Sequence, residues 1–470
     1  MLLENSFIEE IAQKEKDSEW TKKEFESINL GDKRLNKRFI KVAEQLSSQS
    51  TAPINQACDT WPDTKAAYRL FDNEKTTSKQ ILLCHQGAAK ERLKGHEIIL
   101  AAQDTTILDY TKHPKKHGMG PIGKENEKTH GLIMHTTLAM TLGGMPLGIL
   151  DQDIWSRNEE EKGCSEKRKE RPIEEKESNK WLISLEKTAE FSMDGPKIVT
   201  VCDREADIFE FFMKARELNA PILVRAAQNR IILEEVGKLW DYMDSQPVAG
   251  VHTIEIPGKN SKRKANLEIR FASVTIKPPG QLKRFYKENI EPIVIDAVWV
   301  KEFNVSDGEE AIEWMLLTNE KVKTFSDALE KLDWYKKRWC VEEFHKVLKS
   351  GCTVESCRLE KSERLLPFLT LCSVIAWRLL WIVKINRERP EAPCTEILTN
   401  YEWQALYCKI HKTTELPEEV PTVRESVRWI GQLGGFLGRK RDKEPGITVI
   451  WRGWQRLMDI VEAWLIFYPA

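Results

Sequence analysis

The sequence has almost no net charge and no paired-cysteine motif. It carries 72 lysines and arginines against 73 aspartates and glutamates, a formal net charge of -1, so any contact with a polyanion must come from local patches. None of the 10 cysteines forms a Cys-x-x-Cys pair, and no histidine spacing completes a metal site beside the closest pair, Cys352 and Cys357. This excludes a disulfide framework and a zinc finger, and it favours buried, reduced thiols in a cytosolic protein.

The sequence also lacks a signal-peptide pattern and a convincing membrane span. Its first ten residues are rich in glutamate, where a secretory signal has basic and then apolar residues. The segment from Leu365 to Val383 is almost continuously apolar, but Arg378 lies well inside it, at a cost of about 2.5–3.5 kcal/mol for insertion near a helix centre. We therefore predict a buried helix and no membrane association.

Three regions differ in pattern along the 470-residue chain, which is too long for a single core. Residues 1–75 are predicted to be helical, residues 76–360 to alternate strands with helices, and residues 361–470 to be helical again. Within the central region, residues from about 235 to 318 favour β-structure. The expected strands are 97–102, 132–142, 147–154, 197–202 and 221–225, followed by 252–256, 267–276, 292–300 and 313–317. The fold class is thus α/β with a β-rich insertion.

A compact basic face is expected near the N-terminus. From Leu35 the apolar residues follow helical spacing, and beside them stand two rows of cations at i,i+4 spacing, which include Lys33 with Lys37 and Arg34 with Arg38. Such a helix is either an ordinary solvated surface helix or a module that grips DNA phosphates.

The segment from Tyr335 to Lys349 is predicted to be one helix with its ionic residues on one face. At about 100° per residue, Tyr335, Arg338, Glu342 and Lys349, with Lys346, fall within roughly an 80° arc, and apolar residues fill the opposite side. A single carboxylate among cations and a phenol suits a metal-bound phosphodiester. The alternative is a solvated helix face with paired charges.

Two aspartates share one local context. Asp104 and Asp203 each follow an apolar run and open a polar turn, so both are expected at the carboxyl ends of strands, where functional groups of open α/β sheets gather. Asp104, Asp203 and Glu342 could then converge, and all-oxygen ligands select Mg²⁺ or Mn²⁺. The alternative is that both aspartates are turn or helix-cap residues.

Taken together, these motifs resemble the bacterial cut-and-paste transposases of the Tn5 type, within the insertion-sequence-four family. The resemblance rests on Gln103-Asp104-Thr105-Thr106, on Val201-Cys202-Asp203-Arg204-Glu205-Ala206-Asp207, and on the spacing Y-x2-R-x3-E-x6-K that begins at Tyr335. It extends over nearly the whole chain, from Leu30-Gly31-Asp32 to Leu433-Gly434-Gly435-Phe436.

The resemblance implies a ribonuclease-H-like catalytic core with Asp104, Asp203 and Glu342 as an acidic triad. Two Mg²⁺ ions, which Mn²⁺ can replace, would be bound there. The family nicks the transposon end, makes a hairpin on the opposite strand, reopens it with water and joins the end to target DNA. The β-rich insertion between Asp203 and Glu342 is also a mark of this family.

The resemblance further implies specific DNA contacts. Trp314 matches a tryptophan that stacks on a base flipped out of the duplex, although a tryptophan in a strand can simply be core. Tyr335, Arg338, Lys349 and Arg225 would hold phosphates near that base. The family prototype has a lysine where this chain has Ala227, so that contact is not carried over. End recognition is expected at Lys33, Arg34, Lys37, Arg38 and Arg69.

The expected partners follow from the same resemblance. They are double-stranded transposon-end DNA, target DNA and a second copy of the chain in a synaptic complex, in the bacterial cytoplasm at the nucleoid. The apolar stripe formed by Leu457, Ile460, Val461, Trp464 and Leu465 is either core or a dimer surface. Two rival hypotheses are a catalytically silent, transposase-derived inhibitor and a structure-selective nuclease on the same core.

Overall fold

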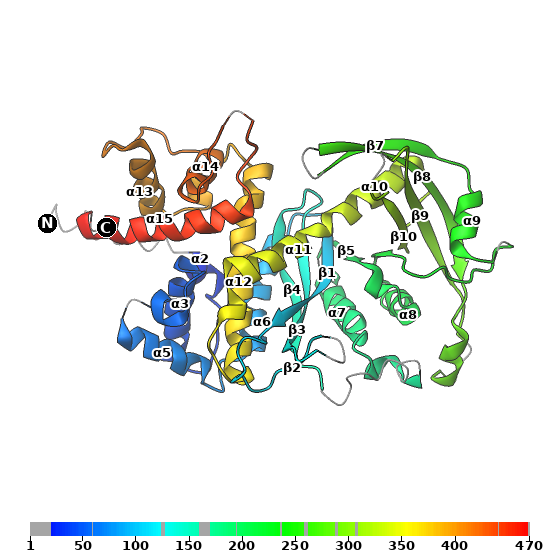
Figure 1. Ribbon diagram of the computed structural model, residues 1–470, viewed down its shortest axis with the longest axis horizontal. Helices are drawn as coiled ribbons and strands as arrows, with labels where there is room; N and C mark the ends of the chain where they lie inside the picture. Colours follow the sequence, from blue (N-terminus) through cyan, green and yellow to red (C-terminus); the bar gives the residue numbers. More distant parts are fainter. Residues whose placement is uncertain are drawn as a thin grey trace.

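The computed structural model describes residues 20–58, 60–123, 127–158, 170–193, 195–235, 237–257, 262–286, 290–305, 309–439 and 441–468. Figure 1 shows a large sheet with its covering helices beside two groups of helices, one from each end of the chain. The long helix α12, Ser362–Glu388, stands between them. Residues 1–19, part of the charged stretch at 159–169, the turn at 258–261 and Lys440 lie outside the described residues.

The N-terminal region is helical, as predicted, and polar side chains set where its helices begin. Asp32 caps one helix by accepting a hydrogen bond from the Arg34 backbone N at 2.7 Å, and Gly31 before it has a left-handed φ of +74°. Thr60 and Thr77 cap two others. The helices are α2 (Trp20–Glu24), α3 (Lys33–Ser48), α4 (Ile54–Ala57), α5 (Trp61–Phe71) and α6 (Ser78–Leu93).

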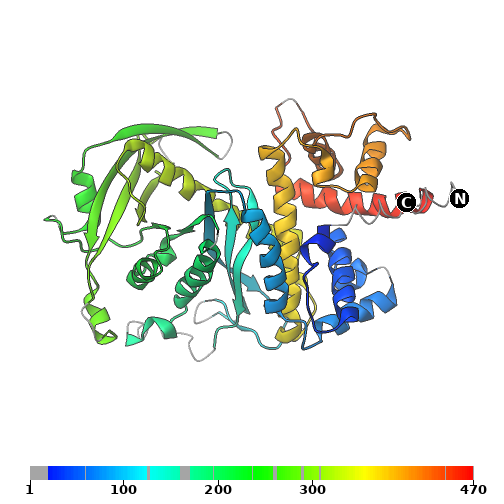
Figure 2. The ribbon, with the colours of Figure 1, turned by 180° about the vertical axis from the view of Figure 1, so that it is seen from behind.

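The central region forms a mixed sheet. Strand β1 runs parallel to β5, and β5 runs parallel to β6, whereas β3 pairs antiparallel with β1 and with β4. The order of these five strands is β4-β3-β1-β5-β6. The strands are β1 (Ile98–Asp109), β2 (Gly120–Pro121), β3 (His130–Met140), β4 (Pro146–Trp155), β5 (Lys197–Cys202) and β6 (Ile222–Arg225). Helices α7 (Asn179–Ala189) and α8 (Phe209–Glu217) pack on this sheet (Figure 2).

The β-structure predicted between residues 235 and 318 is present, and its strands belong to the same sheet as the strands before it. Strand β10 pairs antiparallel with β6, and β9, β8 and β7 continue outward, so the insertion extends the core into one ten-stranded sheet. The elements are α9 (Leu239–Ser245), β7 (Gly250–Pro257), β8 (Lys262–Ile276), β9 (Ile293–Phe303) and β10 (Glu313–Thr318). Short 3₁₀ turns lie at Ile173–Glu175, Glu190–Ser192, Arg204–Ala206, Gly280–Arg284, Val354–Ser356 and Cys394–Glu396.

The single helix predicted from Tyr335 to Lys349 is wrong in one respect, because the chain forms three segments there. Helix α10 spans Phe325–Lys337, α11 begins after Arg338 and spans Trp339–Lys346, and a π-helical turn follows at Val347–Gly351. The interruption places Glu342 in the first turn of α11, where the helix dipole favours a negative charge.

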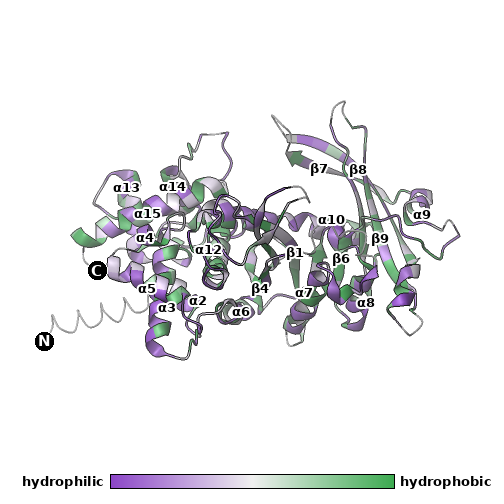
Figure 3. Cartoon of the chain, turned by 60° about the horizontal axis from the view of Figure 1, so that its bottom comes forward, coloured by the Kyte–Doolittle hydropathy of each residue, from purple (hydrophilic) through white to green (hydrophobic). Residues whose placement is uncertain are grey.

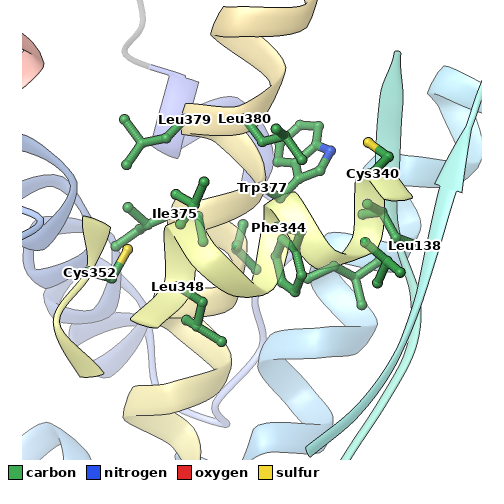
Figure 4. Close-up of a cluster of buried hydrophobic side chains, with 14 of the residues drawn as sticks. Leu138, Cys340, Phe344, Leu348, Cys352, Ile375, Trp377, Leu379 and Leu380 are labelled. Atoms are coloured by element: carbon green, nitrogen blue, oxygen red, sulfur yellow. The ribbon is translucent and has the colours of Figure 1, made fainter. Parts of the chain in front are cut away.

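The C-terminal region is helical and built around α12. This helix is long and apolar enough to cross a membrane by length and composition, but 83% of its most apolar window is buried inside the protein. The predicted buried helix is therefore confirmed. In Figure 4, Trp377 and Leu380 of α12 lie on the side of Phe344 of α11, and Leu138 of the sheet lies beside Phe344. The remaining helices are α13 (Asn400–His411), α14 (Val423–Leu433) and α15 (Ile447–Phe467).

The apolar stripe of α15 packs mainly against other helices of the same chain. Leu457 and Val461 are buried, and Trp454 on the same helix donates from Nε1 to the Ser47 carbonyl at 3.2 Å, which joins α15 to α3. Ile460, Trp464 and Leu465 are partly buried, and only the last turn, with Phe467, is largely exposed. All nine cysteines in the described part of the chain are buried, as predicted.

Candidate active site

Asp104 lies inside strand β1 rather than in the turn that we predicted. The strand continues to Asp109 because residues 105–109 keep pairing with β3. Parallel pairing between β1 and β5 nevertheless stops at Ala102 and Val201, so Asp104 lies just beyond the point where the two strands separate. Successive side chains of a strand point to opposite faces. Asp104 faces α11, where it contacts His345, whereas Thr105 bonds to His135 on the face covered by α7.

Asp203 follows the last residue of β5, as the sequence predicted. Its carboxylate caps the short turn after the strand by accepting a hydrogen bond from the Glu205 backbone N at 2.9 Å. Burial raises the pKa of Asp203 above its ordinary value, and the negative charges of Asp104 and Glu205 add to the rise against the opposing hydrogen bond. Asp203 is therefore a turn cap and also part of a charged cluster, so the two alternatives considered for it are not exclusive.

Glu342 completes this cluster from α11. Arg338 donates from Nη2 to Glu342 Oε1 at 2.5 Å, and its Nη1 lies 3.8 Å from Asp104 Oδ1. Burial raises the pKa of Glu342, Arg338 opposes the rise, and the charges of Asp104 and Asp203 add to it. The structure thus brings together the three carboxylates that the sequence singled out, with one guanidinium between two of them.

The described residues contain no group of three or more His, Cys, Asp and Glu side chains that is already arranged to hold a metal ion. In this arrangement Arg338 supplies the positive charge between Asp104 and Glu342. The donor set nevertheless suits a hard divalent cation, because it consists of carboxylate oxygens, two of which belong to groups whose ionised form is incompletely stabilised by the protein.

His345 is a member of the site that the sequence reasoning missed. It lies one helical turn after Glu342, its side chain is 6% exposed, and its Nδ1 lies 3.2 Å from Asp104 Oδ2. Its Nε2 is buried without a hydrogen-bond partner. The signal in the sequence was the i,i+3 spacing from Glu342, which places both side chains on one side of a helix.

A second group of predicted residues meets beside the carboxylates. The rings of Trp314 and Tyr335 pack edge to face with centroids 5.3 Å apart. Arg225 donates from Nη2 to the Glu313 carbonyl at 3.1 Å. Burial raises the pKa of the Tyr335 hydroxyl, and the positive charges of Arg338 and Arg225 oppose the rise. Trp314 is only partly buried, so one part of its indole remains available.

Trp314 also lines a cavity of about 510 Å³. Arg204, Arg225 and Trp240 contribute to the same cavity, together with Ala227, where the family resemblance pointed to a lost lysine contact. Two cationic side chains and two indoles around one cavity suit a stacked base with an adjacent phosphate.

Lys349, another residue predicted to contact DNA, does not line the Trp314 cavity. Lys349 lies on the π-helical turn, and its Nζ is 3.7 Å from Glu355. Trp339, which the sequence reasoning did not select, is 61% exposed directly after Arg338. Its signal was an aromatic residue inside an otherwise ionic segment.

The basic residues predicted to recognise DNA ends are exposed, and they belong to helices away from the sheet (Figures 1 and 3). They are Lys33, Arg34, Lys37 and Arg38 on α3 and Arg69 on α5. Arg439, in the basic loop before α15, pairs with Asp442 at 3.2 Å.

Two family models match the ends of the chain. Residues 17–76 match a transposase DNA-binding domain, and residues 374–466 match the transposase Tn5 dimerisation domain. Both ends of the chain are thus similar to domains of Tn5-type transposases. The matched ranges agree with the N-terminal helices and with the helical region from α12 to α15.

One solved structure similar to this chain is a piggyBac transposase synaptic complex with hairpin DNA. The two chains share 10% sequence identity, and the alignment covers 75% of this chain and 66% of that one, with a TM-score of 0.35.

Proposed function

We propose that the chain is an active cut-and-paste DNA transposase whose catalytic residues are Asp104, Asp203 and Glu342. The observation that supports this most strongly is that these three side chains, which are far apart in sequence, lie close enough to interact electrostatically. Burial and repulsion between the carboxylates raise the pKa of Asp203 and of Glu342. A cluster of this kind costs folding stability, which is reasonable where the charges serve a reaction.

The strand arrangement supports a ribonuclease-H-like core. Three parallel strands, β1, β5 and β6, are flanked by the antiparallel β3 and then β4. Two candidate catalytic carboxylates extend from adjacent strands at the place where β1 and β5 separate, and Glu342 approaches them from a helix. This is the placement that polar functional groups take in open α/β sheets.

Asp104, Asp203 and Glu342 would hold two Mg²⁺ ions, or Mn²⁺ in their place. Such ions, when bound, activate a water or a 3′-hydroxyl and stabilise the leaving oxygen of a phosphodiester. Arg338 is then available for a phosphate oxygen, because a cation replaces it beside Glu342 and Asp104. Tyr335 and Arg225 lie close enough to share that role.

We place DNA on two surfaces of the protein and the second copy on a third. The exposed cations of α3 and α5 would bind the transposon end, in keeping with the DNA-binding match at residues 17–76. Trp314 would stack on a nucleotide displaced during hairpin formation, and the exposed Trp339 offers a second indole beside Arg338. Two copies would pair through the C-terminal region, each on one end, in the bacterial cytoplasm.

A strand-transfer reaction tests this function. The purified protein, MgCl₂, a duplex carrying the inverted repeat that flanks its gene and a supercoiled target plasmid should yield nicked, hairpin and joined products. Hydrolysis without joined products would indicate a structure-selective nuclease instead. End binding without any cleavage would indicate a catalytically silent inhibitor, and either result would overturn the proposal.

A further inference from the structure

Asp207 is a buried carboxylate whose partners all lie on the loop after strand β6. Its side chain has no exposed surface, and its Oδ2 accepts hydrogen bonds from the backbone N of Ala227 at 2.8 Å and of Gln228 at 3.0 Å. Its Oδ1 accepts one from Arg230 Nε at 2.7 Å. One carboxylate thus fixes two peptide groups and one arginine of a loop about twenty residues away in the chain.

This loop forms one wall of the Trp314 cavity. Arg225, Ala226 and Ala227 line the cavity, and the Ala226 backbone N donates to the Met315 carbonyl at 2.7 Å, directly beside Trp314. On its other side, Asp207 ends the short turn that Asp203 begins. Asp207 is therefore the link between the turn that carries a catalytic carboxylate and the wall that carries Arg225.

We infer that Asp207 is a positioning residue that keeps the Arg225 wall of the cavity in register with the catalytic carboxylate Asp203. The inference rests on the proposed function. It deepens that function by assigning Asp207 to the step in which a displaced nucleotide must lie in the cavity while its phosphate reaches the carboxylates. A displacement of about 1 Å between two parts of a site can cost on the order of 10²-fold in rate.

A buried carboxylate that only stabilises the fold should not affect hairpin formation when it is replaced. The β-rich region contains such a carboxylate for comparison. Asp296 on β9 is also buried, at 4% exposure, and accepts a hydrogen bond from the Val322 backbone N at 2.8 Å with Lys321 nearby. It does not line the cavity. Asp296→Asn is therefore a matched control for the loss of a buried carboxylate that holds a backbone N–H.

The experiment compares Asp207→Asn with Asp296→Asn in single-turnover reactions on a pre-formed end complex. Asparagine keeps the shape, but only one of its two terminal atoms accepts hydrogen bonds. The ratio of hairpin to first nick should fall about ten-fold in Asp207→Asn and stay unchanged in Asp296→Asn. A 2-aminopurine at the terminal nucleotide should show reduced base displacement in Asp207→Asn alone. Arg230→Lys keeps the charge but loses the forked geometry of the guanidinium. Its ratio of hairpin to first nick should lie between that of Asp207→Asn and that of the unaltered protein.

Three results would overturn the inference. Unaltered hairpin-to-nick ratio and 2-aminopurine signal in Asp207→Asn would show that the link is unnecessary. An equal fall in both asparagine variants would show a general effect of lost stability. Absence of hairpin from the unaltered protein would refute both the proposed function and this inference. The first two results would refute only the role of Asp207, so the two kinds of failure can be told apart.

Discussion

The carboxylates at two places in the molecule have different surroundings. At the junction between the N-terminal helices and the sheet, Glu24 of α2 contacts His85 Nδ1 at 2.5 Å and Arg92 Nη1 at 2.7 Å. Burial alone would raise the pKa of Glu24, but these two partners hold it at about 2. His85 in turn accepts a hydrogen bond at Nε2 from the Ile149 backbone N at 2.8 Å, which assigns its proton to Nδ1.

At the candidate active site the pKa values of the carboxylates shift in the opposite direction, upwards. Burial raises the pKa of Asp203 and of Glu342, their carboxylates repel one another, and Arg338 compensates only part of this charge. The junction thus lowers the pKa of its carboxylate, whereas the site raises the pKa of Asp203 and of Glu342. This difference supports the proposal that the first group serves the fold and the second serves a reaction.

The largest effect should come from removing one carboxylate of the site. Asp104→Asn, Asp203→Asn or Glu342→Gln should lower cleavage by roughly 10³-fold or more, because each removes a charge that would hold the cation. Gel assays of nicking with Mg²⁺ measure the loss, and gel-shift assays of end binding serve as the control. Appreciable cleavage by any of the three variants would remove that residue from the triad.

At the junction, Glu24→Gln should destabilise the protein by about 3–5 kcal/mol, because it leaves Arg92 without its buried partner. Since the pKa of Glu24 is lowered on folding, its contribution is present above its ordinary pKa of 4.5 and is lost as the pH falls towards 2. Urea unfolding at pH 7 and at pH 4 measures this. Glu91→Gln, which breaks the exposed pair with Lys94, should change stability by less than about 0.5 kcal/mol. Equal effects of the two variants would contradict the account of the junction.

Trp314→Ala tests how far the site extends beyond its charges. Stacking of a base on an indole contributes about 1–3 kcal/mol, so hairpin formation should slow by roughly 5- to 150-fold, with first-strand nicking still occurring. Trp314→Phe keeps an aromatic face and should recover part of the rate. A normal hairpin yield from the alanine variant would count against the stacking role.

The smallest effect concerns stability without metal. Because the pKa of Asp203 is raised on folding, its ionised form destabilises the protein at neutral pH, and this penalty disappears as the pH falls below the raised pKa. Asp203→Asn should therefore raise the Tm in EDTA by about 1–3 °C at pH 7 and by less at pH 4. Differential scanning fluorimetry at both pH values decides, and a lower Tm at pH 7 would show that Asp203 stabilises the fold instead.

The sequence predicted the elements that depend on local pattern. Apolar runs marked β5 and the hairpin of β3 and β4, and Asp203 was placed correctly at the end of a strand. Asp104 was misplaced because the polar residues after it look like a turn, whereas pairing with β3 extends the strand. Helical periodicity also continues through Arg338, so the interruption before α11 left no signal.

Local sequence patterns did not predict contacts between residues that are far apart in the chain. The pairing of β10 with β6 joins segments about 90 residues apart, and the Asp207 contacts with Ala227 and Gln228 use backbone atoms, which carry no sequence information. The three carboxylates were singled out by their expected places at strand ends and on a helix, and the resemblance of their motif spacing to a family favoured the catalytic interpretation. The pKa shifts that set the site apart from the junction depend on burial, which a single sequence does not reveal.

Binding of Mn²⁺ is the most direct test of the central claim, which is that the site needs a cation and the junction does not. Electron paramagnetic resonance of Mn²⁺ with the full-length protein should show binding that is lost in Asp203→Asn and kept in Glu24→Gln. Mn²⁺ should also raise the Tm of the unaltered protein more than that of Asp203→Asn. Equal Mn²⁺ affinity in the unaltered protein and in Asp203→Asn would contradict the claim.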